Sequence, residues 1–368
     1  METRAPLRQL AALYLRLGFT AFGGPAAHVA MLEEAAVQRL GWLSRAEFLD
    51  LLGVCNLLPG PSSTQLAMAV ALRRAGWRGL LLGGLCFILP AAALTLGLAW
   101  AYVRFGALPH AAGFLAGLKP VAVAVVLQAV WKLWPSAVKN ARSAAVAALA
   151  LAAALLGLPP LWVLLGAGLC LRLAAAEAAP GSWAWLPTAA PAAAPPALSL
   201  AAVFLAFVKL GLSVFGGGYV LLAFLQADLV ERWHWLTQAQ LLDAVAAGQV
   251  TPGPVFSTAT FIGYLLLGVP GAALATVGIF LPSFLMVGGL GPWVAGLRRS
   301  PHSADFLDGI NAAALALMAG ACWSLGQAAL VNGWTWALGL GACLLLLRWR
   351  VNSGYVLLLG GLVGYCLG

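Results

Sequence analysis

The stretch "NLLPGPSSTQ", residues 56–65, places two prolines and a glycine inside an otherwise apolar part of the chain. A related stretch, "QVTPGPVFST", residues 249–258, repeats the pattern 193 positions later. Proline lacks a backbone donor and clashes with the preceding turn, so a helix that reaches either motif must end there. Two matched interruptions of apolar helices therefore decide which fold this chain can adopt.

The composition is that of an integral membrane protein. Of 368 residues, 62% are apolar and 8% are charged, and the mean hydropathy is +0.95. Soluble proteins carry about 25% charged residues. Backbone groups in lipid must be paired within their own helix, and the alternation of a β-barrel is missing. We predict an all-α, polytopic helical bundle of about 10–12 membrane segments at about 20 residues each.

The net charge of +9 does not indicate a nucleic-acid partner. The lysines and arginines are scattered between apolar stretches, as the positive-inside rule expects of a multi-pass protein of the cytoplasmic membrane. The six cysteines show no C-x-x-C spacing and fit small buried side chains, so we expect neither a metal site nor a cofactor.

The chain consists of two versions of one unit. When residues 17–64 are laid over residues 210–257, Phe22-Gly23-Gly24 falls on Phe215-Gly216-Gly217, and Pro59-Gly60-Pro61 falls on Pro252-Gly253-Pro254. We therefore predict an N-terminal repeat over residues 1–177, a Pro- and Ala-rich linker over 178–197 and a C-terminal repeat over 198–368.

Two signals in the sequence disagree on the relative orientation of the repeats. Segments 73–78 and 132–142 are basic while their counterparts carry no charge, which favours inverted repeats. An even number of spans before the linker would instead favour parallel repeats. We prefer inversion, because the apolar stretches 143–157 and 161–173 are short for two crossings.

Each Pro-Gly-Pro motif is expected to separate two half-helices. Capping signals at Ser44 and Thr237 start helices that can run only to about residues 57 and 250, a length of about 20 Å against a hydrocarbon core of about 30 Å. A second half-helix then begins near Pro61 and Pro254. Its unpaired N–H groups, the following hydroxyls and the helix dipole favour an anion at that point. Packing kinks are the alternative, which the duplication of the breaks weakens.

The candidate substrate-binding residues lie in these breaks and at two matched intramembrane cations. They are Phe22, Gly23, Gly24, Pro25, Asn56, Pro59, Gly60, Pro61, Ser62, Ser63, Phe215, Gly216, Gly217, Gly218, Gln249, Thr251, Pro252, Gly253, Pro254, Arg16 and Lys209. Glycines allow close approach of the backbone to a ligand, and a cation inside a span is functional by default.

Several ionisable residues have two interpretations. Arg16 and Lys209 face the substrate, or they form structural ion pairs with Asp50 and Asp243 respectively. A second set is unmatched between the halves and is a candidate for proton coupling; these residues are His28, Glu33 and Glu34. For this set the alternative is a packed neutral histidine and a solvated helix end.

The segments "FTAFGGPAAHVAMLEE" and "RLGWLSRAEFLDLLGVCNLLPGPSSTQLA", with "FGGGYVLLAFLQADLV" and "GQVTPGPVFSTATFIGY" in the second half, resemble the chromate ion transporter family of prokaryotes, in its long two-domain form. The resemblance implies efflux of chromate, with sulfate as an isosteric competitor, and chromate resistance as the consequence. The implied partners are the oxyanion and the lipid bilayer, without nucleic acid, and a homodimer stays open. Gly218 stands where the first half has Pro25, so the two breaks need not share one geometry.

Two other functions compete with export. One is import of sulfate or another oxyanion. The other is a membrane enzyme acting on a lipid-linked substrate, which would need convergent acids, bases or metal ligands. The chain has 11 carboxylates and four histidines, without H-E-x-x-H, D-x-x-D or P-loop spacing. We therefore expect a transporter rather than an enzyme.

Overall fold

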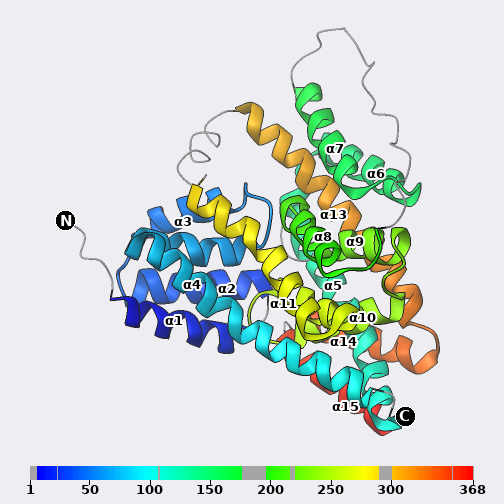
Figure 1. Cartoon of the computed structure of the whole chain (residues 1–368). Helices are drawn as coiled ribbons and strands as arrows, with labels where there is room; N and C mark the ends of the chain where they lie inside the picture. Colours follow the sequence, from blue (N-terminus) through cyan, green and yellow to red (C-terminus); the bar gives the residue numbers. More distant parts are fainter. Residues whose placement is uncertain are drawn as a thin grey trace.

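The computed structural model describes residues 6–22, 24–106, 108–175, 196–215, 220–289, 301–349 and 351–367. Within these ranges every regular element is helical (Figure 1), which confirms the all-α bundle. Of the predicted linker, residues 178–195 lie outside the described ranges.

The two halves present matching helices in the same order, and the second half adds the short turn η3. The first half comprises α1 (Leu7–Thr20), α2 (Gly24–Glu33), the π-helical η1 (Glu34–Arg39), α3 (Arg45–Cys55), α4 (Ser62–Phe105), α5 (Pro109–Ala137), α6 (Ala141–Leu155) and α7 (Pro160–Ala175). The second half comprises α8 (Leu200–Ser213), α9 (Leu221–Leu225), the π-helical η2 (Gln226–Arg232), α10 (Gln238–Val250), the 3-10 turn η3 (Val255–Ser257), α11 (Thr258–Gly289), α13 (Pro301–Ala329), α14 (Gly333–Arg348) and α15 (Ser353–Leu367).

The half-helices before the breaks form as predicted. α3 begins with a complete capping box between Ser44 and Glu47, and α10 begins with one between Thr237 and Gln240. The hydrogen bond from the Ser44 backbone N–H, followed by that from its hydroxyl, holds the pKa of the Glu47 carboxyl below its usual value. Both helices end before Pro-Gly-Pro, α3 at Cys55 and α10 at Val250.

The helices after the breaks turn back on themselves, which the sequence analysis did not foresee. α4 is non-helical at Ala75 and Gly76, and α11 is non-helical at Leu267 and Gly268, where each glycine has φ +62°. Beyond the kink of α11 the chain returns along its first arm, so that the Thr260 and Thr276 hydroxyls lie 2.7 Å apart. Each helix after a break is therefore the short first arm of a helical hairpin.

Four helical segments are long and apolar enough to cross a membrane. They are Ser62–Phe105, Ala111–Ala137, Val255–Gly289 and Asp305–Ala329. Shorter apolar helices of 10–17 residues accompany them. With 15 and 16 residues, α6 and α7 reach only about 23 Å at about 1.5 Å per residue. Each is thus shorter than the hydrocarbon core of about 30 Å.

The long helices of the two halves pack antiparallel at the centre of the molecule. The Cys322 thiol, in the last third of α13, lies 3.8 Å from the Val123 carbonyl in the middle of α5, whereas Lys139 after the end of α5 pairs with Asp308 near the start of α13. Equivalent helices that run in opposite directions are the arrangement expected of inverted repeats.

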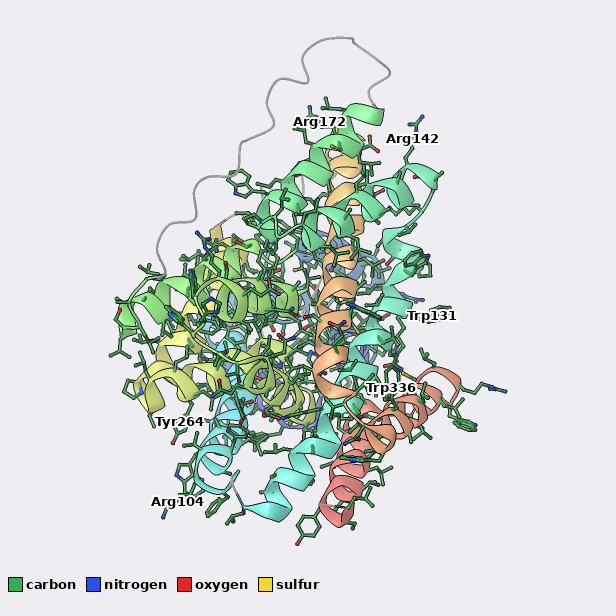
Figure 2. The ribbon with its side chains drawn as sticks, turned by 90° about the vertical axis from the view of Figure 1, so that its right-hand side faces the viewer. Arg104, Trp131, Arg142, Arg172, Tyr264 and Trp336 are labelled. Carbon is green, nitrogen blue, oxygen red and sulfur yellow. The ribbon has the colours of Figure 1, made fainter. Side chains whose placement is uncertain are left out.

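Each long helix also holds the last two helices of the other half. α5 packs against α14 and α15, while α13 packs against α6 and α7 (Figure 1). Figure 2 shows Arg142 and Arg172 at one end of the molecule and Arg104 with Tyr264 at the other. Arg142, at the end of the basic segment 132–142, and Tyr264, just before the uncharged turn 266–271, therefore lie at opposite ends.

Candidate functional site

The first Pro-Gly-Pro break borders a cavity between the two halves. The cavity has a volume of about 560 Å³, which lies within the range of about 300–1,000 Å³ typical of small-molecule sites. Four of the predicted binding residues line it: Pro25, Asn56, Gly60 and Ser62. The break therefore meets the interface of the repeats, where transporters of this architecture bind substrate.

The opposite wall belongs to the two antiparallel long helices. Its polar side chains are Gln128, Lys132 and Ser136 of α5 and Asn311 of α13. Among the described residues of this lining, Lys132 alone is charged. The three α5 residues are spaced four apart, which places them on one face of the helix.

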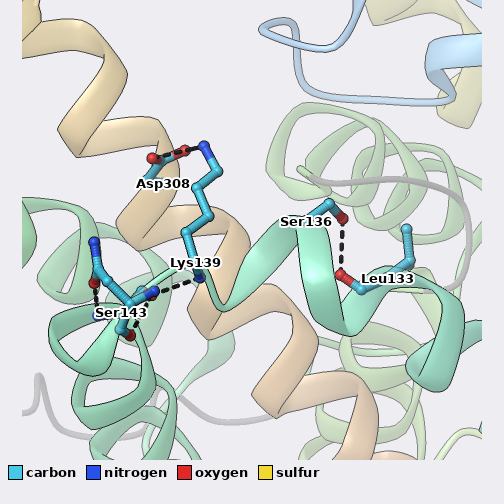
Figure 3. A network of polar contacts seen from close by, with 6 residues as sticks. Leu133, Ser136, Lys139, Ser143 and Asp308 are labelled. Carbon is cyan, nitrogen blue, oxygen red and sulfur yellow. Dashed lines mark hydrogen bonds and ion pairs between the residues drawn. The ribbon is translucent and has the colours of Figure 1, made fainter.

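Lys132 is the functional candidate that sequence reasoning missed, because it counted only as part of the basic segment 132–142. The signal that could have found it is the polar stripe on an otherwise apolar helix. The Arg142 end of the same region carries an ion pair between the halves. Figure 3 shows Lys139 reaching Asp308, at 2.6 Å, and the Ser136 hydroxyl donating to the Leu133 carbonyl at 2.7 Å.

The start of α4 provides donors at this cavity. α4 begins at Ser62 with Pro61 as its N-cap, and its first main-chain bond of this turn runs from the Gln65 N–H to the Pro61 carbonyl at 2.9 Å. The amides of the preceding positions are those that a helix leaves without intrahelical acceptors, and the helix dipole adds roughly half a positive charge there. Ser62 lines the cavity beside them.

Two side chains behind Ser62 are buried with unmet hydrogen-bonding capacity. The Thr64 hydroxyl and the Gln65 Oε1 atom have no hydrogen-bond partner. The Gln65 Nε2 group, by contrast, donates to the Pro59 carbonyl at 2.6 Å. Buried polar atoms are paired in most proteins. The start of α4 therefore has a buried hydroxyl and a buried amide oxygen without partners.

The breaks of the two halves interlock through their backbones. The Gly60 N–H donates to the Val214 carbonyl at 2.6 Å, and the Gly253 N–H donates to the Ala21 carbonyl at 3.0 Å. Each Pro-Gly-Pro motif is thus bonded to the residue just before the Phe-Gly-Gly motif of the other half. The glycines have φ +114° and +90°, a region that side chains disfavour. At these two glycines the backbones of the two halves therefore approach each other closely.

The Phe-Gly-Gly breaks are only partly described. α1 ends at Thr20 and α2 starts at Gly24, which has φ +75°. Phe22 between them is 38% exposed, and Phe215 is half-buried. Four predicted residues of these breaks lie outside the described ranges, namely Gly23, Gly216, Gly217 and Gly218.

The second Pro-Gly-Pro break is closed. Its predicted binding residues are all buried, and none of them lines the cavity: Gln249, Thr251, Pro252, Gly253 and Pro254. Val255 and Phe256 occupy the positions that Ser62 and Ser63 hold in the first half. The two breaks therefore differ in both chemistry and access.

The predicted ion pair between Lys209 and Asp243 is wrong. Lys209 lies 2.7 Å from the Asp228 carboxylate and 5.4 Å from the centre of the Trp233 ring. Asp243 instead pairs with Lys119 of the other half. The repeat alignment compares positions within each half, so it gives no information on partners that come from the opposite half. Arg16 is exposed on α1, and its pairing with Asp50 stays a prediction.

His28 is part of the interlocked breaks rather than of the cavity lining. It is 3% exposed, with Nε2 at 3.1 Å from the Ala21 carbonyl and Nδ1 at 3.2 Å from the Ser63 hydroxyl. A carbonyl only accepts, so Nε2 carries the hydrogen, and a neutral ring satisfies both contacts. Glu33 pairs with Arg45 at 3.3 Å, and Glu34 is exposed at the start of η1.

Comparisons with known proteins agree on one family. The sequence model of a family described as "Chromate transporter" matches residues 8–171 and again residues 201–365. The chain is 34% identical to the chromate transport protein of Cupriavidus metallidurans, over 88% of this chain and 84% of that protein. It is 32% identical to the chromate transport protein of Pseudomonas aeruginosa, over 87% and 81%, and 30% identical to a probable chromate transport protein of Synechococcus elongatus, over 88% and 86%. No solved structure matches the chain.

Proposed function

This chain belongs to the chromate transporter family, and on that premise we propose that it is a secondary transporter that exports chromate across the cytoplasmic membrane. Residues 1–177 and 198–368 are its two inverted transporter repeats, and the substrate crosses between them. Sulfate, with the same charge and tetrahedral shape, competes for the site.

The observation that carries this proposal is the cavity at the first break. It joins a helix start, the Asn56 amide, the Ser62 hydroxyl and the Lys132 ammonium in one lining at the repeat interface. A tetrahedral dianion needs several donors from different directions together with positive charge, and helix starts and ammonium groups supply these. Among the described residues of this lining there is no carboxylate that would repel the dianion.

The position of Lys132 supports access from the cytoplasm. Lys132 and Ser136 lie on the α5 turns that lead to Lys139 and Arg142, the end assigned to the cytoplasm by its positive charge. Chromate from the cytoplasm thus enters from the basic end and binds at the start of α4. It stays bound there until the cavity opens on the other side of the membrane.

The membrane potential is sufficient to drive export. Moving one charge through 100 mV is worth about 2.3 kcal/mol, so expelling a dianion from a negative interior gains about 4.6 kcal/mol. That energy corresponds to about three decades of concentration at about 1.4 kcal/mol per decade. Uptake of the same dianion would need coupled cations.

Inside-out membrane vesicles test the proposal. Cells expressing the full chain should yield vesicles that accumulate radiolabelled chromate when an inside-positive potential is imposed, and excess sulfate should reduce the rate. Vesicles carrying Asn56→Leu provide the comparison, because this change removes one donor from the lining. Uptake equal to that of vesicles without the protein, in both vesicle orientations, would contradict chromate transport. Uptake driven only in right-side-out vesicles by a cation gradient would contradict export.

A further inference from the structure

The cavity has a counterpart on the other half that is closed in this conformation. The cavity separates α3 from α13, with Leu52 and Asn56 on one side and Asn311 on the other. In the second half the equivalent helices are α10 and α5, and these pack directly together. Leu241–Gln249 of α10 is buried throughout, whereas α3 buries only Phe48 and Cys55. The same pair of elements is thus apart in one half and docked in the other.

The repeat alignment identifies which residues would line the counterpart. Asn56 corresponds to Gln249, 193 positions later, and Asn311 corresponds to Lys119, 192 positions earlier. The offset for the long helices is fixed by the matched starts of α5 and α13, where Pro109-His110 falls on Pro301-His302. The closed counterpart therefore contains an amide and an ammonium, the same two donor types as Asn56 and Lys132 in the open cavity.

Gln249 gives an independent sign that a ligand belongs there. Its side chain is 7% exposed, and its Nε2 group is buried with no hydrogen-bond partner. Leaving a buried donor unpaired costs free energy that a well-packed protein avoids unless another state uses the donor. An oxyanion placed between Gln249 and Lys119 would accept from it.

Lys119 is already bound to an anion, which is the carboxylate of Asp243. The Lys119 Nζ atom lies 3.3 Å from Asp243 Oδ1, and the Tyr102 hydroxyl donates to Oδ2 at 3.0 Å. The Asp243 side chain is 4% exposed and belongs to α10, while Lys119 and Tyr102 belong to the first half. The pair therefore fastens α10 to α5 across the boundary between the repeats.

We propose that Lys119 and Gln249 form a second oxyanion station, opening to the extracellular side, and that the Asp243 carboxylate occupies and locks it while the cytoplasmic cavity is open. This inference rests on the proposed export of a dianion. Asp243 stands in for the substrate, because a carboxylate and an oxyanion compete for one ammonium. When α10 leaves α5, Asp243 leaves with it, and the dianion replaces it as the partner of Lys119. By the same symmetry α3 then docks on α13 and closes the first cavity.

Thiol labelling tests the lock without relying on transport. The matched variants are Leu52→Cys, in the open cavity, and Val245→Cys, its buried equivalent on α10. Both are made in a chain whose six native cysteines are replaced by alanine. An impermeant maleimide should label Leu52→Cys in inside-out vesicles and leave Val245→Cys unlabelled in either orientation. Adding Asp243→Asn should make Val245→Cys reactive from outside whole cells.

Two outcomes overturn the lock. One is a Val245→Cys thiol that stays unreactive from outside in the Asp243→Asn chain, and the other is one that reacts from the cytoplasmic side. Should Asp243→Asn fail to reach the membrane, Tyr102→Phe serves instead, because it removes a single hydrogen bond from the carboxylate. It should raise the outside labelling rate of Val245→Cys, and an unchanged rate would overturn the lock equally.

The station itself is tested by comparing Asp243→Asn with the double variant Lys119→Gln/Asp243→Asn, since both lack the lock and only one keeps the ammonium. The double variant should require about tenfold or more chromate for half-maximal uptake from the outer face, the effect of losing one charged hydrogen bond, with no change at the cytoplasmic face. Equal effects at both faces would overturn the station. If the wild-type chain moves no chromate at either face, the proposed function fails, and the labelling result still decides whether the counterpart opens.

Discussion

Gly60→Ala is the substitution whose cost can be worked out most fully. Gly60 has φ +114°, and a β-carbon there would lie 2.8 Å from both Gln65 Nε2 and Ser283 Oγ. The backbone strain costs about 1–3 kcal/mol. Gln65 must also move away from the Pro59 carbonyl, to which its Nε2 group donates at 2.6 Å. Losing this hydrogen bond costs a further ~0.5–1.5 kcal/mol. Together these two effects lower the free energy of unfolding by about 1.5–4.5 kcal/mol, and both act where the first break contacts the other half.

A matched control separates this crossing from general backbone strain. Gly76 also has a positive φ, +62°, but a β-carbon there meets no atom within 4 Å. Gly76→Ala should therefore cost the backbone strain alone, about 1–3 kcal/mol, and leave the cavity unchanged. The difference between the two variants reports the close approach at the first break.

The assay combines the melting temperature of the purified protein with chromate uptake by inside-out vesicles. Gly60→Ala should melt below Gly76→Ala and should also lose uptake, because Gly60 is part of the cavity lining that the added β-carbon disturbs. The reasoning fails if Gly60→Ala melts and transports like the wild type. It also fails if both variants lose uptake equally.

Other predictions follow from single contacts. Lys132→Gln should raise the half-saturating chromate concentration in vesicle uptake about tenfold or more, because it removes the cavity's ammonium. Lys139→Gln removes a lysine from an exposed pair with Asp308 and should leave this concentration nearly unchanged. Equal effects of the two changes would refute a substrate role for Lys132. Lys209→Ala should lower the melting temperature, because it leaves the Asp228 carboxylate, which is 7% exposed, without its partner. Adding Asp228→Asn removes that buried charge and should restore part of the loss. No restoration would argue against the pair. His28→Gln should keep the pH profile of uptake between about pH 6 and pH 8 unchanged, because a neutral ring already satisfies both contacts; a shifted profile would instead support proton coupling through His28.

Local rules carried the sequence analysis furthest. The capping boxes at Ser44 and Thr237 and the helix ends before Pro-Gly-Pro follow from chemistry within a few residues, and the structure confirms them. The repeat was equally visible, since identical motifs recur at a constant offset. Three predicted residues of the first break, Asn56, Gly60 and Ser62, line one cavity, because the break and the hydroxyl after it are adjacent in sequence.

Features that join the two halves were beyond the sequence analysis. Asp243 pairs with Lys119 and not with Lys209, since an aligned repeat shows equivalence and not proximity. The interlock of Gly60 with Val214 and of Gly253 with Ala21 has the same origin. Alignment also treats the two breaks as equal, whereas the predicted binding residues of the second one are all buried. The substitution of apolar residues for Ser62 and Ser63 was the available signal for that difference.

The most direct test of the account is to locate the anion at atomic detail. Crystals of the protein grown with chromate and measured at the chromium absorption edge should show one anomalous peak in the cavity, beside Asn56, Ser62 and Lys132 at the start of α4. A saturating peak elsewhere, for example beside Arg16 on the outer surface of α1, with this cavity empty, would contradict the central claim.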